Sequence, residues 1–323
     1  MHALPLSDSS AIDLPASASA CDLRRVPIHP DHWYPLAWSH EVKRGKALGV
    51  QFAGDPIVLV RTESGKLFAL EDRCAHRQVP LHAGVVEGES IRCGYHGWAY
   101  DCGGHCIDVP YLGRERLPNG VRAYPCCEVH GLILVLPGEP ALADARPLPV
   151  LRCVGRSLGD DWLEVNYTFA RMAGSQPMGE ALVFGASQNA GNQANKSMMT
   201  VRTCYPYQTL QIRSGDGVLV MDLWIVYVPL DAAQRTNRTF GLLSIRKPKM
   251  PFALDLAWPL LIWFTERIFK EDRWIVEQEQ EAQDRQGADW NREVFPVINE
   301  LRDLLRHCGG RTVIPIRETG NRV

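Results

Sequence analysis

The stretch Cys74-Ala-His76, followed after sixteen residues by Cys93-Gly-Tyr-His96, decides how this chain is interpreted. Two thiolates and two imidazoles form a ligand set that can hold either a tetrahedral zinc ion or one [2Fe-2S] cluster. A structural zinc site usually has two or more residues between the ligands of a pair, whereas only Ala75 separates Cys74 from His76. The spacing therefore favours the cluster over zinc.

The segments around the two pairs predict loops at the tips of hairpins. Strand-like runs at 67–70 and 90–92 come before the pairs, and Val79-Pro80 and Gly97-Trp98 follow them with loop chemistry. This arrangement resembles the Rieske fold, in which two cysteines hold one iron and two histidines the other. The resemblance implies that one [2Fe-2S] cluster is bound by Cys74, His76, Cys93 and His96.

Two further positions show which type of Rieske protein the chain resembles. Respiratory-complex Rieske proteins have two extra cysteines, joined by a disulfide, where this chain has Val79 and Tyr95. The resemblance therefore points to the type of Rieske protein that has a lower reduction potential and passes electrons to oxygenases. Arg77 and Trp98 directly follow the ligand pairs, and we expect them to pack on the cluster or to receive a reductase.

Length and composition limit the class of protein. The chain has 323 residues, of which 46% are hydrophobic, enough for two domains that each have a core. A net charge of −2 does not indicate the positively charged surface that binds nucleic acid or an anionic membrane. The chain has no secretory signal pattern. We interpret Cys102, Cys106, Cys126 and Cys127 as free buried thiols rather than as a second metal site. A location in the reducing cytoplasm is therefore expected.

The order of strand and helix patterns predicts the fold class. After a flexible tail (1–28), short strands and turns over 29–138 predict an all-β Rieske domain, with strands at 48–52, 57–61, 67–70 and 132–136 and a turn at Gly54-Asp55-Pro56. Residues 139–323 predict an α+β domain of the helix-grip type, in which helices cover a curved antiparallel sheet. Its strands are expected at 162–167, 198–212, 217–228 and 238–245, and its helices at 252–284 and 292–308.

The apolar run 252–264 is too short to span a bilayer, so no membrane span is expected. We interpret it as part of a core helix in preference to a patch that faces a membrane or a hydrophobic substrate. In the substrate-facing alternative, Trp258, Trp263 and Phe264 line a pocket.

The two-domain order resembles the Rieske non-haem iron oxygenases. Single-subunit members such as aryl O-demethylases form head-to-tail trimers, and the cluster of one subunit reduces a mononuclear iron in its neighbour. Two histidines and one carboxylate hold that iron. The histidines come from a pattern resembling N-x-x-D-x-x-H-x-x-x-x-H soon after the first strand of the second domain.

That pattern is degenerate in this chain. Asn166 matches the asparagine, but an ungapped register places Phe169 at the acidic position and Met172 and Pro177 at the histidines. No histidine occurs anywhere between 131 and 306, so no other register restores the pair. Phe169 also offers no hydrogen bond in place of the aspartate that bridges the neighbouring cluster to the iron in the family. The resemblance therefore implies that a mononuclear Fe(II) site is not expected.

The third ligand of the family has a counterpart in Asp272. It shares a helix face with Ile268, Ile275 and Val276, which predicts an inward position, and Glu279 continues this face. One alternative is an ion pair of Asp272 with Arg171 or Arg267. Another is a weaker iron site in which Asp272 is joined by Glu180, Glu279 or Asp161.

The sequence therefore predicts an electron-transfer or structural subunit that carries a cluster and accompanies an intact oxygenase subunit in a trimer or hetero-hexamer, with a ferredoxin or flavin reductase as donor. The alternative is an oxidoreductase for a hydrophobic aromatic or polycyclic substrate, working through a non-standard iron site or directly from the cluster. A third interpretation, a ligand-binding module with the cluster as redox sensor, has no sequence feature in its favour. His82, His105 and His130 are expected to be surface or core residues and not ligands.

Overall fold

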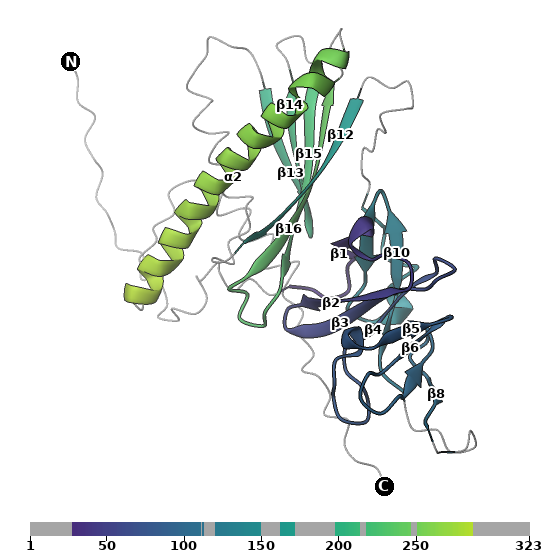
Figure 1. The fold of residues 1–323 in the computed structure, drawn as a ribbon. Coiled ribbons are helices and arrows are strands. Elements are labelled where there is room, and N and C mark those ends of the chain that lie inside the picture. The colour runs from purple at the N-terminus through teal and green to yellow at the C-terminus, as the bar shows by residue number, and fades with distance from the viewer. Residues whose placement is uncertain are drawn as a thin grey trace, which may run out of the picture.

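The structure, a computed structural model, describes residues 28–110, 112, 120–149, 162–171, 198–213, 218–246 and 251–286. Within these ranges the chain forms four antiparallel sheets and one long helix (Figure 1). Three small sheets belong to the first half of the chain, and the second half contributes a larger sheet and the helix. The expected fold class, an all-β unit followed by an α+β unit, is confirmed.

Eleven short strands build the three sheets of the first half. One sheet has the order β1 (Tyr34–Trp38), β11 (Leu132–Val135), β10 (Cys126–Val129). The next has the order β2 (Lys46–Phe52), β3 (Asp55–Arg61), β4 (Leu67–Glu71), β9 (Ala123–Tyr124). The last has the order β5 (Val85–Glu87), β6 (Ser90–Arg92), β7 (Ala99–Tyr100), β8 (Cys106–Asp108). Short 3-10 turns are η3 (Ser39–Glu41), η4 (Leu81–Ala83) and η6 (Pro140–Leu142).

Strands β2 and β3 meet at a two-residue turn, Ala53-Gly54, with φ of 50° and 93°. The expected turn at Gly54-Asp55-Pro56 is wrong by one residue, because Asp55 and Pro56 already pair with β2. Left-handed backbone at both central positions matches the twist of the two strands. Pro56 is tolerated because β4 pairs with β3 only from Ile57 onward, so the missing N–H is not needed there.

Strand β3 is buried on both faces. Ile57 and Leu59 point into one hydrophobic core, and Val58 and Val60 point into another that lies beneath the expected ligand loops. Successive side chains of a strand alternate between faces, which explains how one run of apolar residues serves two cores.

A five-stranded antiparallel sheet forms the second half, in the order β12 (Trp162–Arg171), β16 (Asn237–Arg246), β15 (Leu219–Pro229), β14 (Tyr207–Arg213), β13 (Met198–Cys204). The single strand expected over 198–212 is wrong, because β13 and β14 form a hairpin that turns at Tyr205-Pro206. A proline has no N–H for a strand ladder, which suits this turn position.

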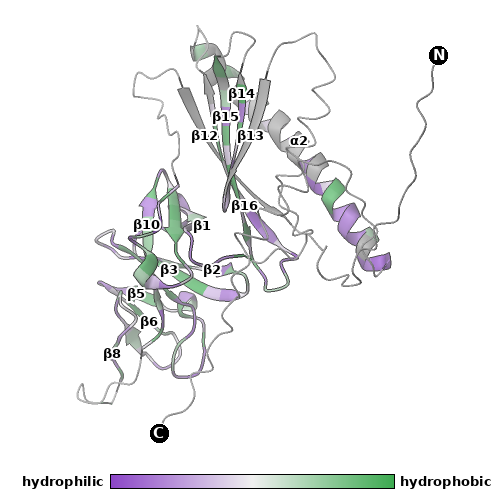
Figure 2. Ribbon diagram, turned by 180° about the vertical axis from the view of Figure 1, so that it is seen from behind, coloured by the Kyte–Doolittle hydropathy of each residue, from purple (hydrophilic) through white to green (hydrophobic). Residues whose placement is uncertain are grey.

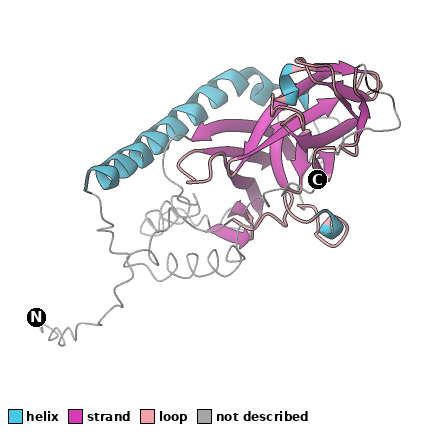
Figure 3. Cartoon of the chain, turned by 90° about the horizontal axis from the view of Figure 1, so that it is seen from below, coloured by secondary structure: helices cyan, strands magenta, loops and turns pink. Residues whose placement is uncertain are grey.

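Helix α2 (Pro251–Gln286) accounts for the helix expected at 252–284. It begins near one end of the five-stranded sheet and runs obliquely past it (Figures 1 and 3). The second expected helix, 292–308, lies outside the described residues. No helix of the described residues is long and apolar enough to cross a membrane.

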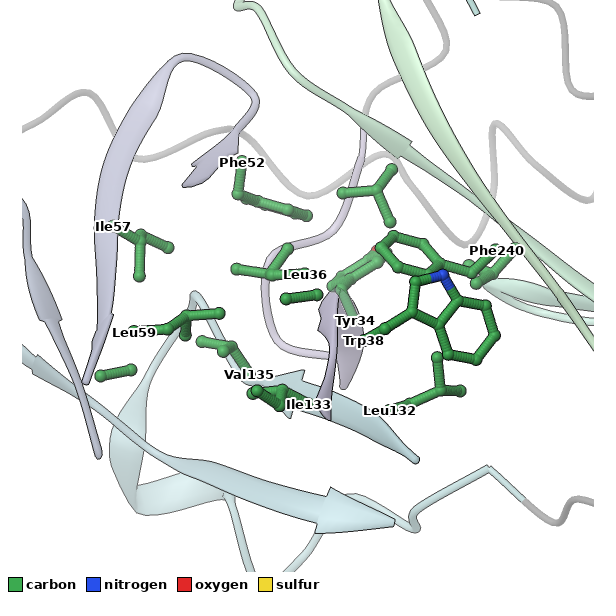
Figure 4. Packing of buried hydrophobic residues seen from close by; sticks show 14 of the residues in the cluster. Tyr34, Leu36, Trp38, Phe52, Ile57, Leu59, Leu132, Ile133, Val135 and Phe240 are labelled. Atoms are coloured by element: carbon green, nitrogen blue, oxygen red, sulfur yellow. The ribbon is translucent and has the colours of Figure 1, made fainter. Parts of the chain in front are cut away.

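Among the described residues, the largest hydrophobic core is shared by the two halves, whereas the sequence predicted a separate core for each. Trp38 of β1 meets Phe240 of β16 with ring centroids 5.8 Å apart, and Tyr34 and Leu132 complete this contact (Figure 4). The reason is that alternate residues of β14, β15 and β16 give the sheet an apolar face that needs cover. Polar links reinforce the junction, since the Arg238 guanidinium donates to the Glu41 carboxylate at 2.6 and 2.8 Å.

An exposed apolar stripe occupies the first turns of α2. Phe252, Leu256, Leu260 and Trp263 are 68, 84, 66 and 56% exposed, so the expected core role of the run 252–264 is wrong at these positions. Residues spaced by three or four share one helix face, and this face points to solvent. Figure 2 shows the hydrophobic first turns of α2 giving way to hydrophilic last turns.

The buried side of α2 is marked by Val276, which is 8% exposed. The expected inward position of Ile275 is wrong, because its side chain is 56% exposed. Neighbouring helix residues diverge by about 100°, so only one of the two can face inward. Trp263, expected in a core or lining a pocket, instead contacts the guanidinium of Arg267, whose Cζ is 6.0 Å from its ring centroid.

Candidate metal centre

The first expected ligand pair lies on the loop that follows β4. The Cys74 N–H donates to the Val79 carbonyl at 2.9 Å, and the Gln78 N–H donates to the Cys74 carbonyl at 2.8 Å. These two bonds close a tight loop in which the Cys74 side chain is buried and the His76 side chain is exposed.

The second pair lies on an equivalent loop between β6 and β7. The Cys93 N–H donates to the Trp98 carbonyl at 2.8 Å, and the Gly97 N–H donates to the Cys93 carbonyl at 3.2 Å. Gly97 has φ of +75°, and a Cβ atom here would lie 2.9 Å from Pro110, so glycine is required on two grounds. Cys93 is again buried and His96 exposed.

The two loops bring like ligands together. Cys74 and Cys93 are buried in the same hydrophobic core, and the His76 and His96 rings lie 4.6 Å apart. The His76 ring stacks on Trp98 at 4.8 Å with an interplanar angle of 4°. This arrangement provides a buried thiol pair and an exposed imidazole pair, which fits the donor chemistry of a cluster held by two cysteines and two histidines.

The pKa values of the ligand side chains follow from this placement. Burial raises the pKa of the Cys93 thiol, the N–H of Tyr95 opposes this by favouring the thiolate, and the neighbouring Cys74 raises it further. The pKa of His96 is lowered by partial desolvation first, and then by the positive charges of His76 and Arg77. The neutral imidazole, which is the form that binds a metal, is thereby favoured.

Tyr100 of β7 is a functional candidate that the sequence analysis missed. Its hydroxyl lies 3.2 Å from Cys74 Sγ and accepts the Ala75 N–H at 3.0 Å. Because the oxygen accepts from Ala75, its own hydrogen is available to the sulfur. Burial first, and then the bond to Cys74, hold the pKa of Tyr100 well above its usual range. Its signal in the sequence is an aromatic residue four positions after His96.

The remaining histidines of the first half have other neighbours. His82 Nδ1 pairs with the buried Asp72 carboxylate, His105 pairs with Asp101 at 3.2 Å, and His130 is exposed in a turn at φ of 52°. A cavity of about 360 Å³ lies beside His82, between the two halves of the chain.

Comparisons with known proteins identify the domain that carries these loops. Residues 32–125 match the family model of the Rieske [2Fe-2S] domain. The 4β-methylsterol monooxygenase of Methylococcus capsulatus is 28% identical over 345 residues, which cover 90% of this chain and 91% of that protein. The oxygenase component of dicamba O-demethylase from Stenotrophomonas maltophilia is 37% identical over 122 residues, 38% of this chain and 36% of that protein.

The crystal structure of dicamba monooxygenase bound to dicamba superimposes with a TM-score of 0.67 at 20% identity, covering 88% of this chain and 99% of that one. The chain is a Rieske oxygenase-family protein. Its Rieske domain implies a [2Fe-2S] cluster.

The second half of this Rieske oxygenase-family protein carries the positions of the degenerate iron pattern. Asn166 and Phe169 lie inside β12, opposite Leu242 and Thr239 of β16, whereas the pattern was expected after the strand. Their register in the pattern therefore stays a prediction. Met172, Pro177, Glu180 and Asp161 lie outside the described residues.

The carboxylate candidate Asp272 lies on α2 one turn before the buried Val276. Its side chain is outside the described part of the structure, as are those of Arg171, Ile268, Trp258 and Phe264. Glu279 is half-buried. The role of Asp272 stays a prediction.

Proposed function

We propose that this chain is an electron-transfer subunit of a Rieske oxygenase system, and that it does not carry out oxygenation by itself. The observation that carries the proposal is an imbalance in the sequence. Both Cys/His pairs of the Rieske domain are present, whereas no histidine occurs between 131 and 306 to serve a mononuclear iron. One redox centre is kept and the usual ligands of the other are missing.

In this proposal Cys74 and Cys93 hold one iron, and His76 and His96 hold the other. The bound cluster supplies storage and transfer of one electron. The protein keeps the thiols away from water, and Trp98 fixes the ring of His76 by stacking on it. Tyr100 orients its hydroxyl toward the sulfur of Cys74.

The exposed rings define where a partner is expected to dock. His76, Arg77, Tyr95 and His96 are exposed around the two loops. The buried residues on which the loops rest belong to a core made, among the described residues, entirely of the first half. We therefore expect the imidazole side to meet another protein: a ferredoxin or flavin reductase as donor, and a related oxygenase subunit as acceptor in a trimer or hetero-hexamer.

The first test is the ratio of iron to acid-labile sulfide in anaerobically purified protein. Two irons per two sulfides are expected, because that is the content of the cluster alone. Three irons per two sulfides would contradict the proposal and would direct attention to the ligand set around Asp272.

The second test concerns the partner. The purified chain, given a reductase and dioxygen, is expected to be inactive alone and to reduce an intact oxygenase subunit in mixed assemblies. A His96→Cys variant, which replaces one imidazole by a thiolate, is expected to change the cluster spectrum and slow this transfer. Turnover of a substrate by the isolated homo-oligomer would refute the proposal.

A second candidate is an oxidoreductase for a hydrophobic polycyclic substrate. It is favoured by the likeness to 4β-methylsterol monooxygenase, which spans both halves of the chain and not the Rieske domain alone. In this candidate Asp272 joins Glu180, Glu279 or Asp161 around an iron, or the cluster serves the substrate directly. An unchanged turnover rate in an Asp272→Ala variant would exclude the iron version.

A further inference from the structure

A buried carboxylate lies at the start of the first ligand loop. Asp72 directly follows β4 and precedes Cys74 by two residues, and its side chain is 5% exposed. Its Oδ1 atom accepts the N–H of His82 at 2.8 Å, and its Oδ2 atom pairs with the Nδ1 atom of the same residue. A buried carboxylate is costly unless hydrogen bonds satisfy it, and His82 supplies two.

His82 lies where this loop ends. It belongs to η4, and its neighbour Leu81 is fully buried in the same core as Cys74. The two bonds to the carboxylate therefore join the ends of the segment 72–82, which contains Cys74 and His76. These two bonds form a closure across the base of the loop, the Asp72–His82 clamp.

The surroundings of the His82 ring are fitted to this clamp. A carboxylate only accepts hydrogen bonds, so Asp72 requires a hydrogen on His82 Nδ1. A Cβ atom at Gly49 of β2 would lie 2.5 Å from that nitrogen, so an alanine there would displace the ring. Glycine weakens a strand, and its presence beside the ring leaves the space that the clamp needs.

We propose that Asp72 and His82 are positioning residues for the [2Fe-2S] cluster, because their clamp holds the loop that presents Cys74 and His76. Stacking on Trp98 orients the His76 ring, whereas the backbone of the loop determines where that ring is attached. The inference rests on the cluster that the Rieske domain implies. It is the same whether the chain only transfers electrons or also oxygenates a substrate.

The test compares His82→Ala with His82→Asn in the purified full chain with its cluster. Alanine removes the ring donor, whereas the amide of asparagine can donate from nearly the same place as Nδ1. His82→Ala is expected to release iron to a chelator about tenfold faster, because losing one hydrogen bond to a buried carboxylate makes opening of the loop easier. The electron paramagnetic resonance lines of the reduced cluster should broaden, since the ligand geometry becomes less uniform. His82→Asn should restore both properties toward those of the wild type.

His105→Ala is the matched control. Asp101 accepts the N–H of His105 at 2.9 Å and pairs with its ring Nδ1 at 3.2 Å, which is the same pattern of contacts. This pair closes the turn between β7 and β8, and that turn contains no expected cluster ligand. Iron release and the resonance spectrum of His105→Ala should therefore equal those of the wild type.

Gly49→Ala disturbs the clamp from β2 without changing either of its residues. It is expected to speed iron release in the wild-type background and to have no further effect in His82→Ala, where no ring remains to be displaced. A general loosening of the strand would instead speed release in both backgrounds, and that result would contradict the inference. If His82→Ala does not fold, Gly49→Ala serves in its place against the wild type.

Three further results would overturn the inference: wild-type iron release and spectrum in His82→Ala, an equal change in His105→Ala, or no recovery in His82→Asn. Far-ultraviolet dichroism at the assay temperature verifies that each variant is folded. None of these results alters the iron-to-sulfide ratio of the wild type, which tests the proposed function. Failure of the clamp is therefore distinguishable from failure of the proposed function.

Discussion

At the scale of single residues, Tyr100 is the side chain outside the ligand pairs with the clearest effect on the cluster. Its hydroxyl lies 3.2 Å from Cys74 Sγ, and hydrogen bonds to the sulfurs stabilise the more negative, reduced cluster. Tyr100→Phe should lower the reduction potential by about 40 mV, which corresponds to a hydrogen bond worth about 1 kcal/mol more in the reduced state. Redox titration followed by circular dichroism measures the shift.

The matched control is Tyr124→Phe, since Tyr124 is also buried but belongs to the other core. Its potential should equal that of the wild type. An equal shift in both variants would mean that the change comes from general loosening of the domain and not from the bond to Cys74.

His32 gives the stability of the fold a pH dependence. Its pKa is lowered from 6.5 to about 4, by burial first and then by the charges of Arg146 and His29, which outweigh the opposing effect of Asp31. The unfolded chain therefore binds a proton that the folded chain resists, so stability should fall as the pH drops from about 6.5 to about 4 and stay level above that range.

After allowance for solvent screening, the expected loss is about 1 kcal/mol. Urea unfolding at pH 7 and pH 5 measures it, with His32→Gln as the comparison. The variant should lose less stability than the wild type over this interval, and parallel losses would rule out the assignment to His32.

At the scale of elements, α2 should tolerate substitution on one face only. Val276→Ala removes two buried carbon groups and should lower the free energy of unfolding by about 1.5 kcal/mol. Leu256→Ala, on the exposed apolar stripe, should change it by less than about 0.5 kcal/mol. Chemical denaturation of both variants checks the contrast, and a larger loss for Leu256 would show that another surface covers the stripe.

The same helix shows what a sequence pattern leaves undetermined. The 3.6-residue period predicted a helix at 252–284, close to the observed Pro251–Gln286, but apolar residues surround its first turns and do not reveal which face is covered. The ligand loops are the opposite case. Cys74, His76, Cys93 and His96 were chosen from their spacing, their flanking segments and the Rieske resemblance, and the structure places the rings of His76 and His96 4.6 Å apart. The loop between the paired strands β6 and β7 is short and has few conformations, whereas the orientation of a helix depends on distant partners.

A related reason explains why the role of Tyr100 and the hairpin at Pro206 were not predicted. The hydrogen bond from Tyr100 joins β7 to the loop after β4, a contact that no local pattern records. The run 198–212 has continuous β character, and the two strands became visible only through their pairing. Both features depend on tertiary contacts, which override local preference.

At the scale of the whole molecule, the shared core makes the two halves one cooperative unit. Phe240 is fully buried against Trp38, so Phe240→Ala should lower the free energy of unfolding by about 3–5 kcal/mol.

In the wild type, loss of the visible absorption of the cluster and loss of far-ultraviolet dichroism should coincide on heating. In the variant the two transitions should separate, because the second half loses its cover while the core beneath the ligand loops contains none of the altered contacts. The control is Phe252→Ala, the same change at a side chain that is 68% exposed, and in this variant the two transitions should still coincide. If the two transitions were already separate in the wild type, the shared core could not be the source of cooperativity.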